Sequence, residues 1–419
     1  MREVAITGLG VCLPSYQSPD DLFQALASGS SLITRDPTLE SMGIKDFLSC
    51  AVTPDDIATL EAVYPQLVKD NICTSGKLAY HALVSSLAQA NYEPHKDNCR
   101  KGLFFGVNKT PVSPEYLHNA WQRFDSSNGT FASHDYDPEP FLQQYRPHAI
   151  VRMMAQQLAI NGPILACSDA CAAGSGSVLA GARRIQAGEI DVAFCGAADE
   201  GASPVMQLVF SKIGAISRCS YDDASAACRP FDKNRSGTVL GDGAGFLVLE
   251  DAERARARGA NILAYVKGGY RTSEAYKMTS TKLDGSLYAN TMVKALEAAG
   301  VSAKDIDHIS AHGTATKSND FAEGHAINRV FGDQVPVTST KSAIGHSLAG
   351  SGAVEAVLSV QSLIKQQLLP TLNYVEQDAE EAAINVVTRS GAANINHVLS
   401  NSFGFGGLNT TLILSREKR

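Results

Sequence analysis

The sequence lacks the features that mark several classes of protein. No apolar run reaches the length of about 18 residues that a membrane-spanning helix needs. The first residues, MREVAITGLGVCLP, lack the longer apolar region and the small-residue cleavage site of a signal peptide. A formal net charge of −7 leaves no basic excess, which argues against a nucleic-acid-binding protein. We therefore expect neither a membrane protein nor a nucleic-acid partner.

A disulfide framework is also missing. The nine cysteines are odd in number and scattered along the chain, as is typical of free thiols in a reducing compartment. We therefore expect a cytoplasmic protein. Cys167 and Cys171 lie four residues apart, but no second pair with metal-ligand spacing accompanies them, so the sequence predicts no metal site of this kind.

Strands and helices alternate along most of the chain. EVAITGLGV near the N-terminus predicts a buried strand, and the alternation is clear from Pro163 onward. It predicts an α/β protein whose sheets are covered by helices. The charged DAERARARG at 251–259 connects two halves, which we place at 1–250 and 251–419. For the helix NDFAEGHAINRVF we expect Asn319 or Asp320 as the N-cap.

Cys171 stands at a predicted strand-to-helix junction, in DACAAGSGS. A thiol at a helix N-terminus faces the positive end of the helix dipole, which lowers its pKa and favours the thiolate. The small residues that follow would let a backbone or a thioester approach closely. Cys167 belongs to the preceding strand, where an inert buried thiol is the better interpretation.

Two histidines occupy similar settings. His312 in SAHGTAT and His346 in SAIGHSLAG each follow an apolar strand and adjoin a glycine. Active residues of α/β sheets gather at the carboxyl ends of strands, so we expect these histidines near Cys171. Lys341 in STKSAIGH has small neighbours and would need a carboxylate if buried, with Glu323 as the candidate.

Two glycine-rich stretches remain. GDGAGFLVLE at 241–250 resembles a phosphate loop but leads into a strand rather than a helix, which argues against nucleotide binding. HVLSNSFGFGGLNTTLILS near the C-terminus reads either as a hairpin or as a loop whose backbone N–H groups face a ligand, with Phe403 as a movable wall.

Together these motifs resemble the elongating β-ketoacyl-[acyl carrier protein] synthases of the thiolase-like superfamily. The resemblance rests on DACAAGSGS, CRPFDKNRSGTVLGDGAGFLVLE, SAHGTATKSNDFAE, TSTKSAIGHSLAGSGAVEA and SNSFGFGGLN. It covers the first dozen residues and most of 163–415. It implies a thiolase-like fold with αβαβα layers, in which two similar halves each hold a mixed five-stranded sheet.

The resemblance also implies roles for particular residues. Cys171 becomes the acyl-accepting nucleophile, and the two histidines become the pair that acts on a malonyl thioester. Cys171 and Phe403 supply the oxyanion hole, and Phe403 is also the gate. The remaining implied residues are a supporting charged pair (Lys341, Glu323), substrate-binding residues (Thr314, Thr316, Phe405, Asn108) and positions near which some members hold a structural monovalent cation (Glu355, Asn401).

The implied reaction is a decarboxylative Claisen condensation that extends an acyl chain by two carbons. It needs no cofactor, because both substrates arrive on the phosphopantetheine of an acyl carrier protein. The family further implies a dimer, either of identical chains or with a chain-length subunit. Possible contacts for the acidic carrier protein are Lys109, Lys212 and Arg218, although solvated surface charge is an alternative for each.

Some residues depart from the family pattern and leave alternatives open. Asn108, Lys109 and Arg152 are polar where the family's acyl pocket is expected, and Gly214 stands where many members have a basic residue. These changes favour a polyketide or polyene pathway over fatty-acid synthesis. The main alternative function is a chain-length-factor-like subunit that does not condense, but such subunits lack the nucleophile. A thiolase would need a second cysteine near the C-terminus, and none follows Cys228.

Overall fold

The computed structural model describes residues 1–69, 72–108, 124–125, 130–131, 147–217 and 223–416. Lys109 and Arg218, two of the predicted carrier-protein contacts, lie outside the described residues. Within these ranges, no helix is both long and apolar enough to cross a membrane.

The N-terminal part of the chain builds a mixed sheet. Its strands, in spatial order, are β7 (Ile164–Cys167), β4 (Lys101–Gly106), β8 (Val192–Glu200), β9 (Leu240–Asp251) and β1 (Val4–Cys12). Strand β4 runs parallel to both β7 and β8, whereas β8–β9 and β9–β1 are antiparallel pairs. The central strands are buried on both faces, as their continuous apolar runs predict.

The C-terminal part repeats this arrangement. Its strands, in spatial order, are β12 (Pro336–Thr338), β11 (His308–Ser310), β16 (His397–Gly404), β17 (Leu408–Ser415) and β10 (Ala264–Ser273). Strand β11 runs parallel to β12 and β16, and the pairs β16–β17 and β17–β10 are antiparallel. The same order of two parallel and two antiparallel pairings gives the chain two similar halves.

The two sheets differ from the expectation in one respect, because they are not separate. Strands β1 and β10 pair antiparallel through Ala5↔Tyr265 and Ile6↔Ala264. This short pairing joins the halves into one 13-stranded sheet, which also includes small edge strands. The charged segment at 251–259 folds as helix α11 (Ala252–Ala257), which connects β9 to β10.

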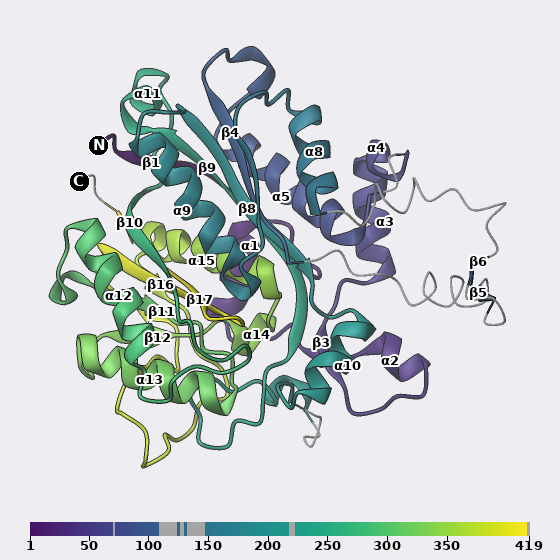
Figure 1. Ribbon diagram of the computed structural model, residues 1–419, viewed down its shortest axis with the longest axis vertical. Coiled ribbons are helices and arrows are strands. Elements are labelled where there is room, and N and C mark those ends of the chain that lie inside the picture. The colour runs from purple at the N-terminus through teal and green to yellow at the C-terminus, as the bar shows by residue number, and fades with distance from the viewer. Residues whose placement is uncertain (70–71, 109–123, 126–129, 132–146, 218–222, 417–419) are drawn as a thin grey trace.

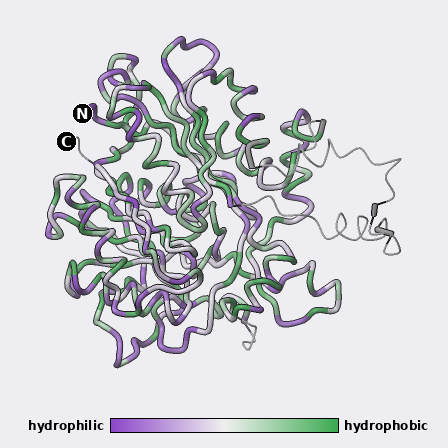
Figure 2. The backbone as a smooth tube through the Cα atoms, in the orientation of Figure 1, coloured by the Kyte–Doolittle hydropathy of each residue, from purple (hydrophilic) through white to green (hydrophobic). Residues whose placement is uncertain are grey.

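Helices cover and separate the two halves in αβαβα layers (Figure 1). Helices α5 (Thr74–Gln89) and α8 (Pro147–Gln157) pack on the N-terminal sheet. Helix α12 (Ser286–Ala299) packs on the C-terminal sheet, and α13 (Lys317–Phe331) lies beside α12. Helices α9 (Ala173–Gln186) and α15 (Ser351–Lys365) lie between the sheets. Hydrophobic residues follow the strands and inner helices, and hydrophilic residues gather in the outer loops (Figure 2).

Glycines bring the two central helices into backbone contact. A Cβ on Gly174 of α9 would lie 2.5 Å from the backbone nitrogen of Ala353, and one on Gly352 would lie 2.6 Å from Ser175 Oγ. Neither position can accept a larger residue without moving a helix. The small residues after Cys171 therefore allow the backbone of α15 to approach closely. A close backbone approach was one of the two purposes that the sequence suggested, and room for a thioester was the other.

Helix α13 begins earlier than the sequence predicted. Its N-cap is Thr316, so the expectation of Asn319 or Asp320 was wrong. Asp320 is instead buried and accepts hydrogen bonds from the backbone N–H groups of Phe231, Thr314 and Ala315. The carboxylate therefore fixes the loop that precedes the helix rather than the helix end itself.

Shorter elements surround this frame. They are α1 (Pro19–Ala27), α2 (Pro37–Ser41), α3 (Pro54–Val63), α4 (Pro65–Lys69), α10 (Pro204–Lys212), α14 (Lys341–Ile344), β2 (Thr34–Arg35), β3 (Leu48–Cys50), β5 (Phe124–Asp125), β6 (Thr130–Phe131), β13 (Gln367–Leu368), β14 (Asn385–Val386) and β15 (Gly391–Ala392).

Candidate active site

Cys171 lies between strand β7 and helix α9, as the sequence predicted. It occupies a single 3-10 turn, Ala170–Ala172, immediately before the first residue of α9. The preceding residue, Ala170, has a φ of +50°, a left-handed conformation that turns the chain sharply from strand to helix. The side chain of Cys171 is buried, with only 7% of its surface exposed. The Cys171 thiol is thus held at the start of the central helix.

The pKa of the Cys171 thiol is opposite in direction to the sequence-based expectation. Burial raises this pKa to about 12, and Asp199 raises it further, whereas Lys341 and the backbone N–H groups of Phe405 and Cys171 lower it. Removal of the thiol from water outweighs the helix N-terminus and the nearby cation. Such a pKa favours the neutral thiol, so a nucleophilic role for Cys171 would require a base to take its proton.

This protonation state can be tested with a thiol-alkylating reagent. Alkylation of Cys171 by iodoacetamide is expected to rise about tenfold per pH unit between about pH 7 and pH 10, because only the thiolate reacts. Peptide mass mapping at each pH measures the rate at this residue, with the other buried cysteines as internal references. A rate that levels off near neutral pH would show that the thiolate already predominates there.

His312 follows strand β11 and is fixed through its backbone. Its N–H donates to Glu323 Oε1 at 2.8 Å, and the next N–H, of Gly313, donates to Glu323 Oε2 at 2.8 Å. Its carbonyl oxygen accepts a hydrogen bond from Lys341 Nζ at 2.7 Å. Within the described part of the chain, Nδ1 of His312 has no hydrogen-bond partner. The main chain thus holds the imidazole in place and leaves this nitrogen available.

His346 reaches the thiol directly. It follows the short helix α14, and its backbone N–H donates to the carbonyl of Val239, just before β9, at 2.7 Å. Its Nε2 lies 3.1 Å from Cys171 Sγ, and its Nδ1 lies 2.9 Å from Ser351 Oγ. The ligand-type atoms of Cys171, His312 and His346 all lie within 4.8 Å of one another. The structure thus brings together the three residues that the sequence singled out, one from the N-terminal half and two from the C-terminal half.

Burial keeps both imidazoles uncharged. It lowers the pKa of His312 and of His346 well below the usual value, and the positive charge of Lys341 lowers both further. Neutral histidines can donate one N–H each without introducing a charge into the buried site.

The charged pair around Lys341 differs from the prediction. Lys341 is fully buried, and its Nζ forms an ion pair with Glu355 Oε1, not with Glu323. Glu323 instead accepts from the two backbone N–H groups of the His312 loop. Burial raises the pKa of Glu323 to about 7, and these N–H donors act in the opposite direction. The pairing follows from helix α15, which places Glu355 beside the lysine.

Glu355 and Asn401 were the positions predicted to adjoin a monovalent cation. Among the described residues, Glu355 Oε2 has no hydrogen-bond partner and is buried, so an anionic oxygen is free to face a cation. Asn401 is already engaged, since its Nδ2 donates to Glu323 Oε1 at 3.2 Å and its Oδ1 accepts from Thr411 at 2.8 Å. Glu355 fits such a site and Asn401 fits it less well. The cation itself stays a prediction.

Phe403, the predicted gate and oxyanion-hole residue, and Phe405 lie in different settings. Phe403 lies inside β16, is 3% exposed and stacks on Tyr288 with ring centroids 3.8 Å apart. Phe405 lies just beyond the strand, is 37% exposed and stacks on Phe210, and its backbone N–H hydrogen-bonds the Cys171 thiol. The positive φ angles of Gly406 and Gly407 allow the turn that presents this N–H. The backbone pair at the thiol is therefore Cys171 and Phe405, and Phe405 is the more exposed ring.

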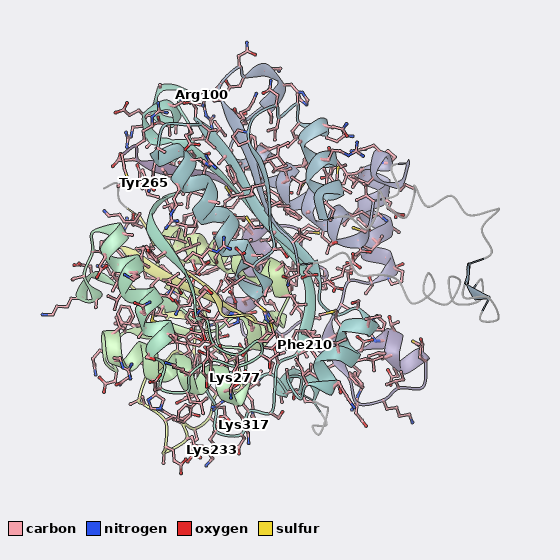
Figure 3. The ribbon with its side chains drawn as sticks, viewed as in Figure 1. Arg100, Phe210, Lys233, Tyr265, Lys277 and Lys317 are labelled. Carbon is pink, nitrogen blue, oxygen red and sulfur yellow. The ribbon has the colours of Figure 1, made fainter. Side chains whose placement is uncertain are left out.

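A single cavity joins these groups to the surface. Besides the Cys171–histidine cluster and both phenylalanines, it is lined by Thr314 and Thr316, the predicted phosphopantetheine contacts, whose hydroxyls lie 2.9 Å apart. Phe210 and Lys277 also line it, and in Figure 3 they lie in the lower half of the view, with Lys317 and Lys233 closer to the lower edge. The cavity thus opens toward a face with exposed lysines.

Asn108, the remaining predicted substrate-binding residue, lies outside that cavity's lining, two residues beyond the end of β4. Its Nδ2 lies 3.4 Å from Asp199 Oδ2, and its carbonyl accepts from Ser168 Oγ at 3.4 Å. Asp199 also contributes to the raised pKa of Cys171, so polar groups stand on this side of the nucleophile as well.

Sequence reasoning missed two side chains that touch the site. Tyr288 packs on Phe403, and its hydroxyl donates to Asn319 Oδ1 at 3.2 Å. Ser351 contacts the ring of His346. Neither carries a sequence signal, because Tyr288 reads as part of an apolar helix face and Ser351 as one of many small residues at a helix start.

Comparisons with known proteins agree with this geometry. Residues 1–255 match the family model "Beta-ketoacyl synthase, N-terminal domain", and residues 263–375 match "Beta-ketoacyl synthase, C-terminal domain". A curated relative is the 3-oxoacyl-[acyl-carrier-protein] synthase 2 of Vibrio cholerae serotype O1, which is 33% identical over 426 residues covering 99% of each chain.

Solved structures are similar over nearly their whole length. One is a type II PKS acyl-carrier protein in complex with its ketosynthase, bound to the hexaketide, with a TM-score of 0.86 and 25% identity over 99% of both chains. Another is the ishigamide ketosynthase/chain length factor, with a TM-score of 0.84 and 29% identity over 99% of both chains.

Proposed function

Because the chain belongs to the β-ketoacyl synthase family, we propose that it condenses a malonyl thioester with an acyl group held on Cys171. The observation that carries this proposal is the convergence of Cys171, His312 and His346 on one cavity. A chain-length-factor-like subunit would not need a nucleophile with an imidazole nitrogen 3.1 Å from its sulfur.

The first half-reaction is acyl transfer. Cys171 Sγ attacks the carbonyl of an acyl carrier-protein thioester, a new S–C bond forms, and the bond to the carrier sulfur breaks. His346 Nε2 accepts the thiol proton and passes it to the departing carrier thiolate. The backbone N–H groups of Cys171 and Phe405 face the sulfur and form the oxyanion hole for the tetrahedral intermediate.

The second half-reaction forms the carbon–carbon bond. The malonyl carboxylate leaves as CO₂, and the electron pair of the broken C–C bond forms an enolate, whose oxygen accepts hydrogen bonds from His312 and His346. The enolate carbon attacks the acyl group, the S–C bond to Cys171 breaks, and a solvent proton restores the thiol. The product is longer by two carbons. This chemistry requires no metal, nucleotide or redox cofactor, because decarboxylation supplies the electrons.

The carrier protein is proposed to dock where the cavity opens. Acidic carriers would be attracted by Lys277 and Lys317, exposed on that face (Figure 3), and by Lys212, exposed at the end of α10. The type II PKS structure contains such a complex, which supports this partner. The protein would work in the cytoplasm, where carrier-linked substrates are made.

A second subunit is also proposed. Strand β7 is the outermost strand of its half-sheet, and Ile164 and Leu165 on it are 47% and 44% exposed. Apolar side chains on an open sheet edge suit pairing with another chain. The ishigamide ketosynthase/chain length factor is an assembly that supports a related partner here. The partner would be either an identical chain or a chain-length-factor-like subunit.

The acyl substrate is proposed to be a polyketide or polyene chain rather than a saturated one. Support comes from half-buried Asn108, which contacts Asp199, a carboxylate close enough to raise the pKa of Cys171, because amide N–H groups can hydrogen-bond a keto oxygen and a saturated chain offers none. Incubation with carrier-protein thioesters of saturated, polyene and 3-keto acyl groups, followed by intact-mass measurement, tests this. We expect the 3-keto group to remain bound at least about tenfold more readily than a saturated chain of equal length, because only the keto oxygen can accept a hydrogen bond. Equal retention would contradict the polar-pocket argument.

A further inference from the structure

His346 has a separate partner at each ring nitrogen. Its Nε2 lies 3.1 Å from Cys171 Sγ, and its Nδ1 lies 2.9 Å from Ser351 Oγ. Ser351 is the first residue of helix α15 and is 3% exposed. Its hydroxyl also lies 3.3 Å from Ser347 Oγ, so it belongs to a small buried hydroxyl pair. The ring nitrogen of His346 that faces away from Cys171 is therefore hydrogen-bonded to a serine hydroxyl.

A hydroxyl can bond an imidazole nitrogen in two ways, because it is both a hydrogen-bond donor and an acceptor. It can donate its hydrogen to a bare nitrogen or accept a hydrogen from an N–H group, and it rotates between the two arrangements. A backbone N–H could only donate, and a carbonyl could only accept. Ser351 therefore satisfies Nδ1 in either neutral tautomer of His346.

The two half-reactions require opposite tautomers. During acyl transfer, Nε2 must be bare so that it can accept the thiol proton, which places the ring proton on Nδ1. During condensation, Nε2 must carry the proton so that it can donate to the enolate oxygen. Burial and Lys341 keep the ring of His346 neutral in both cases, so the tautomer changes and the resting charge does not.

We infer that Ser351 is a positioning residue whose hydroxyl reverses its hydrogen bond to His346 Nδ1 between the two half-reactions. In acyl transfer Nδ1–H donates to Ser351 Oγ, and in condensation Ser351 O–H donates to Nδ1. Between them the ring exchanges protons with water, one gained at Nε2 and one lost from Nδ1, with no net change. The inference rests on the proposed function, because it concerns the tautomers that His346 adopts in the two half-reactions of that function.

The first test separates the two rates in Ser351→Ala. Alanine cannot accept from Nδ1–H, and an unpaired buried N–H is less tolerable than an unpaired acceptor. Acyl loading from a carrier-protein thioester should slow by about tenfold or more. Condensation by enzyme that has first been loaded to completion should change by less than about threefold. Both rates are measured in single-turnover experiments by intact mass.

Ser359→Ala is the matched control. Ser359 lies on the same helix, is 2% exposed, and donates its hydroxyl hydrogen to the carbonyl of Glu355 at 2.7 Å. The Ser359→Ala substitution removes a buried serine hydroxyl from α15 without touching His346, so the rates of acyl loading and of condensation should both match those of the wild type. Equal slowing of loading and condensation in Ser351→Ala would show a general structural effect and would overturn the inference.

A spectroscopic readout reports the tautomer directly. In protein labelled with ¹⁵N-histidine, the nitrogen that bears hydrogen is distinguished by NMR, and the His346 signals are assigned by their loss in His346→Asn. We expect Nδ1–H in the free wild type, Nε2–H in the acylated wild type, and Nε2–H in both states of Ser351→Ala. The same tautomer in both wild-type states would refute the reversal. If the wild type takes up no acyl group, the proposed function fails. The spectra of the two free proteins, wild type and Ser351→Ala, then decide the role of Ser351 separately. Nδ1–H in the wild type alone would support the inference, and the same tautomer in both proteins would overturn it.

Discussion

Replacement of Cys171 by alanine is expected to abolish acyl loading and chain extension, with a loss of about 10³-fold or more in both. The reason is that, among the described residues, no other cysteine lies beside His346 Nε2 and the N–H groups of Cys171 and Phe405. Intact-mass measurement after incubation with an acyl carrier-protein thioester should show the acyl adduct on the wild type and none on the variant.

Cys167→Ala provides the matched control for that result. Cys167 is also buried, and burial followed by Asp169 raises its pKa to about 11, so burial favours the neutral thiol in both cysteines. Cys167 ends strand β7, whereas Cys171 lies in the turn after it, within the histidine cluster. Loading of Cys167→Ala should therefore stay close to that of the wild type. An acyl adduct found on Cys167 of the wild type would refute the choice of nucleophile.

The second large effect is expected at His312. His312→Ala should reduce decarboxylation of malonyl carrier protein, and hence condensation, by about 10²–10³-fold, because one preorganised donor to the enolate oxygen is lost. Acyl loading should change little, since the imidazole partner at the thiol is His346. Release of CO₂ and uptake of the acyl group are measured separately on the same preparation. Loss of loading with decarboxylation preserved would reverse the assigned roles.

His346→Ala separates the two histidines. The family resemblance assigns both histidines to the malonyl thioester, which implies that either variant would still accept an acyl group. The contact of 3.1 Å between Nε2 and Cys171 Sγ changes that expectation for His346 alone. With a thiol whose pKa is raised to about 12, loss of the adjacent base should slow acyl loading as well as condensation. Loading that is equally fast in both histidine variants would show that another group takes the thiol proton.

The sequence predicts well which three residues meet in the candidate site, because each of them follows a strand end. Cys171 follows β7, His312 follows β11, and His346 follows α14, which comes after β12. The repeated topology brings these three positions to one cavity. Partner assignments were less predictable. Lys341 could have paired with either of two glutamates, and the choice of Glu355 depends on how α15 packs beside the lysine.

Phe403 and Phe405 show the same limit on a smaller scale. Both belong to SNSFGFGG, and one-dimensional reasoning cannot tell which N–H faces the thiol. That depends on where strand β16 ends. Pairing with β17 continues to Gly404↔Leu408, which buries Phe403 in the sheet and leaves Phe405 in the turn. Ser351 was equally invisible, because a serine at a helix start ordinarily reads as part of the local small-residue pattern.

The sequence by itself determined the α/β class, the family resemblance and the grouping of Cys171 with His312 and His346, because local hydrophobic patterns and short motifs carry that information. The tertiary structure decided the protonation state of Cys171, the partner of Lys341, the N–H groups at the thiol and the serine behind His346. These depend on burial and on contacts between residues as far apart in sequence as Cys171 and His346, which are 175 positions apart. Desolvation and long-range hydrogen bonding arise only when the two halves enclose the site.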